Sequence, residues 1–218
     1  MAPIAIGIAW VGGWPFVLFW ALAACIVLWE WTQLMTRSRN TVSYTDFLVW
    51  MIAGLLYAGV LALAPIILRR DPALGFVAIL FLFAVVWGTD IAAYFAGRAL
   101  GGPKLWAAVS PNKTWSGALG GALGGVVAAL LVVTVAGLVI APMLVLVALV
   151  LSIASQAGDL LESALKRQFG AKDASDLIPG HGGLMDRLDG FLTAVLAAVM
   201  VGLLREGFDG SARGLLVG

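Results

Sequence analysis

Apolar residues run through most of this chain in stretches long enough to cross a lipid bilayer as helices. A hydrocarbon core about 30 Å thick needs about 20 apolar residues, because each adds about 1.5 Å of helical rise. The pattern predicts spans at residues 14–36, 47–68, 73–97, 117–139, 142–165 and 190–206. Residues 3–12 are also apolar but too few to cross alone. We therefore expect an all-α fold, a polytopic transmembrane helical bundle of six to seven spans, with residues 1–218 as a single integral-membrane domain.

The composition agrees with this prediction. Of the 218 residues, 62% are hydrophobic and 11% are charged, whereas a soluble domain carries about a quarter charged residues. The lipid bilayer is thus the expected environment. The net charge of +1 is too small to indicate a nucleic-acid partner, so the places where charges lie are more informative than their sum.

The connections between the predicted spans are unequally charged. If each of the six spans crosses once, the loops at 37–46, 98–116 and 166–189 emerge on one side of the membrane. That side holds nine of the 13 basic residues: Arg37, Arg39, Arg98, Lys104, Lys113, Lys166, Arg167, Lys172 and Arg187. The other side holds Arg69, Arg70, Arg205 and Arg213. The positive-inside rule predicts that the first side is cytoplasmic, and its two longest loops are expected to build one site.

Ionisable residues occupy one stripe at the end of the fifth predicted span. Ser155, Asp159, Glu162 and Lys166 are spaced by four, three and four residues, which places them on one face of a helix. A carboxylate is costly in lipid, so Asp159 should face a partner or a wet cavity. For Lys166 and the neighbouring Arg167, a helix end that extends its cations to water is the simpler interpretation.

Two further carboxylates lie within predicted spans. Asp90 is in the third span, where an ion pair with Arg98 or another buried cation would be a structural explanation and a partner across a cavity a functional one. Glu30 lies between Trp29 and Trp31, a setting typical of a side chain that anchors a helix at the level of the lipid headgroups.

Charge is concentrated in residues 163–190, SALKRQFGAKDASDLIPGHGGLMDRLDG. Alternating signs can mark a solvated loop whose surface ion pairs contribute little. The glycines of PGHGG, however, free the backbone around His181 to present N–H groups to an anion. Asp186 and Asp189, three residues apart at the start of the last helix, can point together at a cation. Such oxygen ligands suit Mg2+ with bound phosphates, so the stretch indicates a phosphate and divalent-metal site at a membrane surface.

A second polar element, SPNKTWSG at 110–117, lies in a loop on the same predicted side. Ser110, Lys113 and Thr114 offer hydrogen-bond donors to an anion. Thr114 or Ser116 can also cap the following helix. The two roles are compatible, because a helix N-terminus that carries hydroxyl groups suits an anion.

The charged stretch resembles, position by position, the signature of the phosphatidate cytidylyltransferase family, also called CDP-diacylglycerol synthases. The matching elements are S-A-L-K-R, K-D-A-S-D-L-I-P-G-H-G-G and L-M-D-R-L-D, from Ser163 to Asp189. The resemblance continues in QAGDLLES (156–163), SPNKTWSG (110–117) and WGTDIAAYFAGR (87–98). It implies a nucleotidyltransferase of phospholipid synthesis that makes CDP-diacylglycerol and pyrophosphate from CTP and phosphatidic acid. It also implies Mg2+, with room for a second cation, and a bacterial inner membrane with the active site facing the cytoplasm.

The resemblance assigns residues to this chemistry. It implies metal ligands in the order Asp159, Asp186, Asp189 and Asp90, and catalytic roles for Asp159, Asp186, Lys166 and His181. It places these residues at the substrates: Ser110, Lys113, Thr114, Arg167, Lys172, Asp173 and Arg187. The expected partners are CTP, phosphatidic acid and the bilayer, without nucleic acid, and a homodimer is a candidate assembly. The chain departs from the family pattern at Ser116, where a glutamate is usual, and at Gly190, where a serine is frequent.

Two other functions stay open at this point. A related membrane enzyme would phosphorylate a polyprenol or phytol, or make the CDP derivative of another lipid, because cytidine recognition cannot be read from these residues. A cation transporter would use Asp90 and Asp159 as intramembrane ion ligands. A transporter should distribute its ionisable residues toward both faces of the membrane, whereas here they gather toward one.

Overall fold

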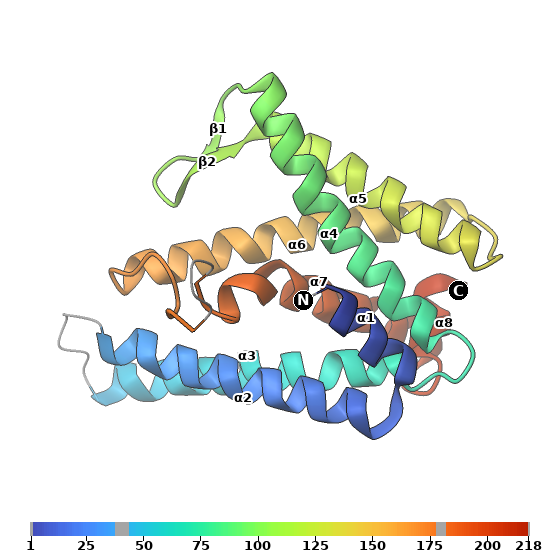
Figure 1. Cartoon of the computed structure of the whole chain (residues 1–218), viewed down its shortest axis with the longest axis horizontal. Coiled ribbons are helices and arrows are strands. Elements are labelled where there is room, and N and C mark those ends of the chain that lie inside the picture. Colours follow the sequence, from blue (N-terminus) through green and yellow to red (C-terminus); the bar gives the residue numbers. More distant parts are fainter. Residues whose placement is uncertain (1, 38–43, 178–181, 218) are drawn as a thin grey trace.

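Long helices make up most of the molecule (Figure 1). The computed structural model describes residues 2–37, 44–177 and 182–217. Its elements are α1 (Ala2–Val11), α2 (Gly13–Arg37), α3 (Tyr44–Arg69), α4 (Gly75–Leu100), β1 (Lys104–Trp106), β2 (Ser110–Thr114), α5 (Trp115–Val135), α6 (Pro142–Gln168), α7 (Met185–Glu206) and α8 (Ser211–Leu216).

The predicted fold class is confirmed. Within the described residues, six helices, α2 to α7, are long and apolar enough to cross a membrane. The apolar segment at the N-terminus forms α1, which has 10 residues and is too short to span. Three features differ from the prediction: α7 begins at Met185 rather than at residue 190, α8 follows it, and β1 and β2 form a small antiparallel hairpin.

The connections between the helices lie at two opposite ends of the bundle. In Figure 1 the hairpin, the connection from α6 to α7, the end of α2 and the start of α3 all lie toward the left. The turns from α3 to α4 and from α5 to α6 lie toward the right. The two long polar loops that the topology places on one side therefore do lie at one end of the molecule.

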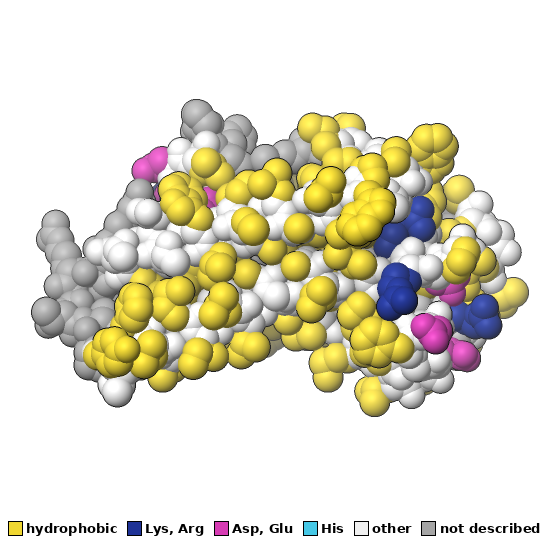
Figure 2. All heavy atoms as spheres, turned by 90° about the horizontal axis from the view of Figure 1, so that it is seen from below, with side chains coloured by type: hydrophobic (Ala, Val, Ile, Leu, Met, Phe, Trp, Pro, Cys, Tyr) yellow, Lys and Arg dark blue, Asp and Glu magenta, His cyan; other side chains and the backbone are white. Residues whose placement is uncertain are grey.

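The side of the bundle formed by α2 and α3 has the surface expected of a lipid-facing wall. Hydrophobic side chains cover most of its length, and charged side chains gather near the ends (Figure 2). Leu22 on α2, and Ile52 and Leu56 on α3, are among the exposed apolar residues of these helices. Apolar side chains exposed in the middle and charges at the ends are what a membrane-spanning bundle requires.

Helices α4 and α5 pack closely because glycines replace side chains along their contact. Gly117, Gly121 and Gly125 recur every fourth residue on α5 and are buried. A Cβ atom built at Gly121 would lie 2.9 Å from the Ala93 Cβ and 2.9 Å from the Thr89 carbonyl oxygen of α4. Small residues at this spacing let two membrane helices approach until their backbones touch.

Substitution of one of these glycines tests the packing. Gly121→Ala is expected to destabilise the protein by about 1–3 kcal/mol, because the added methyl group meets a backbone carbonyl that cannot move aside cheaply. Gly59→Ala on α3 is the matched control, since a Cβ there meets nothing within 4 Å. Thermal unfolding of both variants in detergent should show a lower midpoint for Gly121→Ala alone. Equal midpoints would contradict the close contact of α4 with α5.

The hairpin begins where the chain leaves α4. Gly101 and Gly102 have φ values of 60° and 105°, which glycine adopts readily, and they turn the backbone into β1. Thr114 ends β2 and caps α5, where its side-chain oxygen accepts a hydrogen bond from the Gly117 N–H at 3.1 Å. The capping role expected of Thr114 is thus confirmed, and the hairpin holds Lys113 directly before this cap.

Candidate active site

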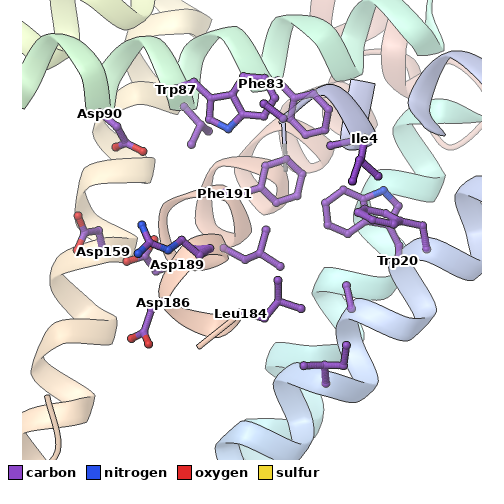
Figure 3. A pocket seen from close by; sticks show the side chains of 18 of the residues that line it. Ile4, Trp20, Phe83, Trp87, Asp90, Asp159, Leu184, Asp186, Asp189 and Phe191 are labelled. Atoms are coloured by element: carbon purple, nitrogen blue, oxygen red, sulfur yellow. The ribbon is translucent and has the colours of Figure 1, made fainter. Parts of the chain in front are cut away.

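A cavity of about 810 Å³ lies among α1, α2, α4, α6 and α7. Its two ends differ in chemistry (Figure 3). We call one the acidic end; it is formed by Asp90, Asp159, Asp186 and Asp189. We call the other the aromatic end; it is formed by Trp20, Phe83, Trp87 and Phe191. One continuous cavity therefore offers carboxylates on one side and an apolar wall on the other.

The acidic end is assembled from three helices. Asp90 comes from α4, Asp159 from α6, and Asp186 and Asp189 from the first turns of α7. Because residues three apart on a helix share a face, Asp186 and Asp189 both reach the cavity. The four predicted metal ligands thus line one cavity, although up to 99 positions separate them in the sequence.

Lys166 lies between Asp186 of the acidic end and Glu162 of its own helix, and it contacts both carboxylates. It is 8% exposed, and its Nζ donates to Asp186 Oδ1 at 2.5 Å and to Glu162 Oε1 at 3.1 Å. Glu162, itself 4% exposed, also accepts a hydrogen bond from the Tyr57 hydroxyl of α3 at 3.2 Å. The stripe predicted for α6 therefore faces inward, and Glu162, to which the sequence assigned no site role, is the second carboxylate that holds Lys166 in place.

Lys113 of the hairpin forms an ion pair with Asp159 of α6. Both side chains are about one-third exposed, and Asp159 lines the cavity. The hairpin and the end of α6 are thus joined by a charge pair, as expected if the two long polar loops build one site.

The glycine-rich turn before α7 surrounds carboxylates of the chain itself. The Gly183 N–H donates to Asp186 Oδ2 at 2.8 Å, and the Ala174 N–H donates to the same oxygen at 3.0 Å. Gly182 has a φ of 80°, and a Cβ there would lie 2.9 Å from Asp186 Oδ2. At Gly183 the N–H group is taken by the chain's own Asp186, so the prediction that this turn presents N–H groups to a bound phosphate stays a prediction. His181 lies outside the described residues.

Glu30 is the largest error of the sequence interpretation. It does not anchor α2 at the headgroups but is completely buried, with 0% exposed surface. Its carboxylate accepts hydrogen bonds from the Ser175 hydroxyl at 2.6 Å, the Leu184 N–H at 2.8 Å and the Met185 N–H at 2.6 Å. The available signal was a carboxylate inside an apolar span, which requires a partner inside the protein.

The other expected site residues are divided between the cavity and its surroundings. Asp173 and Arg187 line the cavity. Arg167 and Lys172 are exposed, and Arg167 donates to the Ala171 carbonyl at 3.2 Å. Ser110 pairs with Trp106 in the hairpin. Substrate contacts of these residues, and of Thr114, stay predictions.

Within the part of the chain that the structure describes, Asp90 forms no ion pair with Arg98 or with another buried cation. Arg98 donates to the Tyr94 hydroxyl at 2.9 Å, and none of the ion pairs between described residues joins Asp90 to Arg98. Asp90 lines the cavity instead.

At position 190, where the family frequently has a serine, the structure leaves room only for glycine. A Cβ there would lie 2.6 Å from Ser155 Oγ, so the hydroxyl group of Ser155 occupies the space that a larger residue would need.

The acidic end suits a hydrated divalent cation. Among the described residues, no three carboxylate, imidazole or thiol groups are close enough together to form a closed metal site. Mg2+ does not require one, because it keeps several water ligands and takes one or two carboxylates with substrate phosphates. Asp159 and Asp186 each already attract an ammonium group, from Lys113 and Lys166. The donor set and its affinity for cations therefore fit the metal.

Comparison with known proteins supplies the family. Residues 44–204 match a family described as the cytidylyltransferase family. The phosphatidate cytidylyltransferase of Brucella suis biovar 1 is similar to this chain, with 44% identity over 246 residues that cover 94% of the chain and 90% of the relative. That of Bacillus subtilis is 40% identical over 173 residues, covering 79% of the chain and 63% of the relative. That of Staphylococcus saprophyticus is 37% identical over 172 residues, covering 78% and 64%.

Proposed function

The chain belongs to the cytidylyltransferase family, and we propose that the cavity among α1, α2, α4, α6 and α7 is where it joins CTP to phosphatidic acid. The family match and the bacterial relatives support CTP-dependent synthesis of CDP-diacylglycerol. The chain is accordingly a membrane-embedded nucleotidyltransferase of phospholipid synthesis. The proposal concerns the place of each substrate and the roles of the residues around it.

The single observation that carries this placement is the division of the cavity into an acidic and an aromatic end. The reaction joins a soluble polyanion to a lipid that stays in the bilayer. Both substrates must therefore meet where apolar walls give way to charge. Acyl chains suit the aromatic end, because burial of apolar surface there is favourable. The triphosphate suits the acidic end, where a metal and basic side chains can neutralise it.

At the acidic end, Asp159 and Asp186 are the proposed principal ligands of Mg2+, with Asp189 and Asp90 beside them. When bound, Mg2+ would neutralise phosphate oxygens and stabilise the charge that develops on the departing pyrophosphate. A second cation beside Mg2+ is a further proposal. Lys113 and Lys166 hold the two principal carboxylates, and Arg187 lines the cavity; in this proposal the three cations contact the phosphate oxygens of CTP.

The proposed step is an in-line displacement at phosphorus. A phosphate oxygen of phosphatidic acid attacks the α-phosphorus of CTP, and the bond between that phosphorus and the oxygen bridging to the β-phosphate breaks. The products are CDP-diacylglycerol and pyrophosphate. The protein contributes mainly by positioning and by charge stabilisation, since phosphoryl-type transfer needs little covalent participation from side chains.

The membrane orientation follows from the same charges. We propose that the end of the bundle carrying the hairpin and the α6–α7 connection faces the cytoplasm of a bacterial inner membrane, because that end holds the excess of Lys and Arg. CTP is a cytoplasmic nucleotide, so the acidic end would open toward its supply. A homodimer stays a proposal that the contacts within one chain do not address.

The function is tested by following which phosphorus atom of CTP is transferred to the lipid. Purified protein in detergent micelles is given phosphatidic acid, Mg2+ and CTP labelled at either the α- or the γ-phosphorus. Only the α-label should enter the lipid, and both should be retained in solution when Mg2+ is chelated. In a parallel reaction with a polyprenol or phytol in place of phosphatidic acid, transfer of the γ-label to that lipid would instead identify a kinase. Cation movement across vesicles without lipid labelling would identify a transporter.

The aromatic end is tested by Trp87→Ala. Loss of this ring removes part of the apolar wall next to Phe83, with which it stacks at 4.9 Å between ring centroids. The KM for phosphatidic acid should rise about tenfold or more, because a buried aromatic contact of about 1.5–3 kcal/mol is lost. The KM for CTP should stay within about twofold. Trp29→Ala, an exposed tryptophan of α2, is the control, and an equal effect of both variants on the two KM values would contradict the placement.

A further inference from the structure

We propose that Glu30 is a positioning residue for the transfer reaction, which fixes the place of Asp186 by holding the turn that leads into α7. The proposal rests on the function assigned above to Asp186. It concerns a residue 156 positions away in the sequence that does not line the cavity. Glu30 lies on α2, and three of its hydrogen bonds go to the segment around the turn.

Burial of the Glu30 carboxylate has a cost in free energy. An ionised carboxylate with no exposed surface is unfavourable unless hydrogen bonds or opposite charge compensate it. The ion pairs between described residues do not include Glu30. Its compensation comes from the two backbone N–H groups of Leu184 and Met185 and from the Ser175 hydroxyl.

The two N–H groups that Glu30 accepts from belong to the N-terminus of α7. The first N–H groups of a helix have no partner within the helix and need an acceptor from elsewhere. Leu184 is the N-terminal capping position of α7, and its own side chain makes no capping hydrogen bond. Glu30 therefore caps α7 from another helix. The positive end of the α7 dipole stabilises its negative charge in turn.

The residues that Glu30 holds are directly connected to Asp186 of the acidic end. Gly183 lies between two carboxylates: its N–H donates to Asp186, and a Cβ there would lie 2.6 Å from Glu30 Oε1. Met185, whose N–H donates to Glu30, directly precedes Asp186. Any shift of Glu30 would move the turn and thus the Asp186 oxygens relative to Lys166 and Asp159. Glycine at position 183 is the residue that leaves room for both acids.

The discriminating variant is Glu30→Gln, which keeps the size of the side chain. Its carbonyl oxygen can still accept, but its NH2 group can only donate and would face either the Leu184 or the Met185 N–H, so the cap would loosen. We expect kcat to fall at least tenfold and the Mg2+ concentration for half-maximal rate to rise at least fivefold. Hydrogen–deuterium exchange should accelerate in the peptide covering 182–187 and stay unchanged in α5. Glu30→Asp, which keeps the charge but shortens the reach, should recover part of both kinetic changes.

Matched controls separate positioning from general stability. Glu206→Gln makes the same chemical change at an exposed position of α7, and it should leave rate, Mg2+ dependence and exchange as in the parent protein. If Glu30→Gln is too unstable to purify, Glu30→Asp is tested in its place. It should show smaller shifts of the same kind in Mg2+ dependence and in exchange at 182–187.

Either of two results would overturn the proposal. One is an unchanged Mg2+ dependence and unchanged exchange at 182–187 in the Glu30 variants. The other is a loss of activity fully explained by a smaller folded fraction. The exchange measurement does not use the reaction, so it still tests the cap if the parent protein should fail to make CDP-diacylglycerol.

Discussion

Replacement of Asp186 by asparagine is expected to lower turnover about 10²- to 10³-fold or more, the loss seen when a group that stabilises transition-state charge is removed. The Asp186 carboxylate accepts from the Lys166 ammonium group and from the Gly183 and Ala174 N–H groups, and it lines the cavity. An asparagine keeps one acceptor oxygen but loses the charge that would hold Mg2+. The rate of labelled-lipid formation at saturating CTP and phosphatidic acid measures the effect.

The control for this variant lies in the same loop. Asp176→Asn changes an exposed carboxylate ten residues earlier that does not line the cavity. Its turnover should stay within about twofold of the parent protein, as is usual for surface substitutions. A folded Asp186→Asn protein with full turnover and unchanged Mg2+ dependence would remove Asp186 from the metal site.

Replacement of Lys166 by methionine is expected to have the largest effect on stability. It leaves Glu162 and Asp186 facing each other without the ammonium group that joins them. Breaking a buried ion pair by removing one partner costs about 3–5 kcal/mol. The midpoint of thermal unfolding in detergent should fall, and turnover should fall with it, because Asp186 loses the contact that helps to place it.

A second substitution identifies the cause of this loss. Glu162→Gln in the Lys166→Met background removes the unpaired charge at the more deeply buried site, so it should restore part of the unfolding midpoint without restoring turnover. Arg167→Met, at the next and exposed position, should lower the midpoint by much less. If the midpoints of Lys166→Met and Arg167→Met were equal, Lys166 would not hold the buried network together.

Apolar pattern was sufficient to predict the spans, because lipid requires long runs of apolar residues in helices whose backbone groups are satisfied internally. It was insufficient at the start of α7. The helix begins at Met185, within the polar sequence, because Glu30 of α2 supplies acceptors for its first N–H groups. A contact over more than 150 positions leaves no local pattern in the sequence.

At the acidic end, too, the sequence predicted some features and missed others. Spacing on a helix indicated that Asp186 and Asp189 share a face and that Asp159 and Lys166 share another, since such periodicity is local. Which carboxylate contacts which lysine depends on how α6, α7 and the hairpin pack. No local pattern therefore indicated that Lys113 pairs with Asp159 or that Tyr57 donates to Glu162.

The aromatic end could not be predicted at all. Trp20, Phe83 and Phe191 come from three helices and are apolar residues in apolar spans, so nothing distinguishes them in sequence from residues that face lipid or fill a core. Only the packing of α2, α4 and α7 around a cavity separates them from other aromatic residues. The proposed place of the acyl chains is thus an inference from the fold alone.

The central claim is that carboxylates from α4, α6 and α7 hold a divalent cation that binds CTP at the acidic end. A structure of the protein with Mg2+ and a non-hydrolysable CTP analogue tests it most directly. The account predicts metal density coordinated by Asp159 and Asp186, with the triphosphate beside Lys113, Lys166 and Arg187. Nucleotide bound at the opposite end of the bundle, with Asp159 and Asp186 still paired only to their lysines, would contradict it.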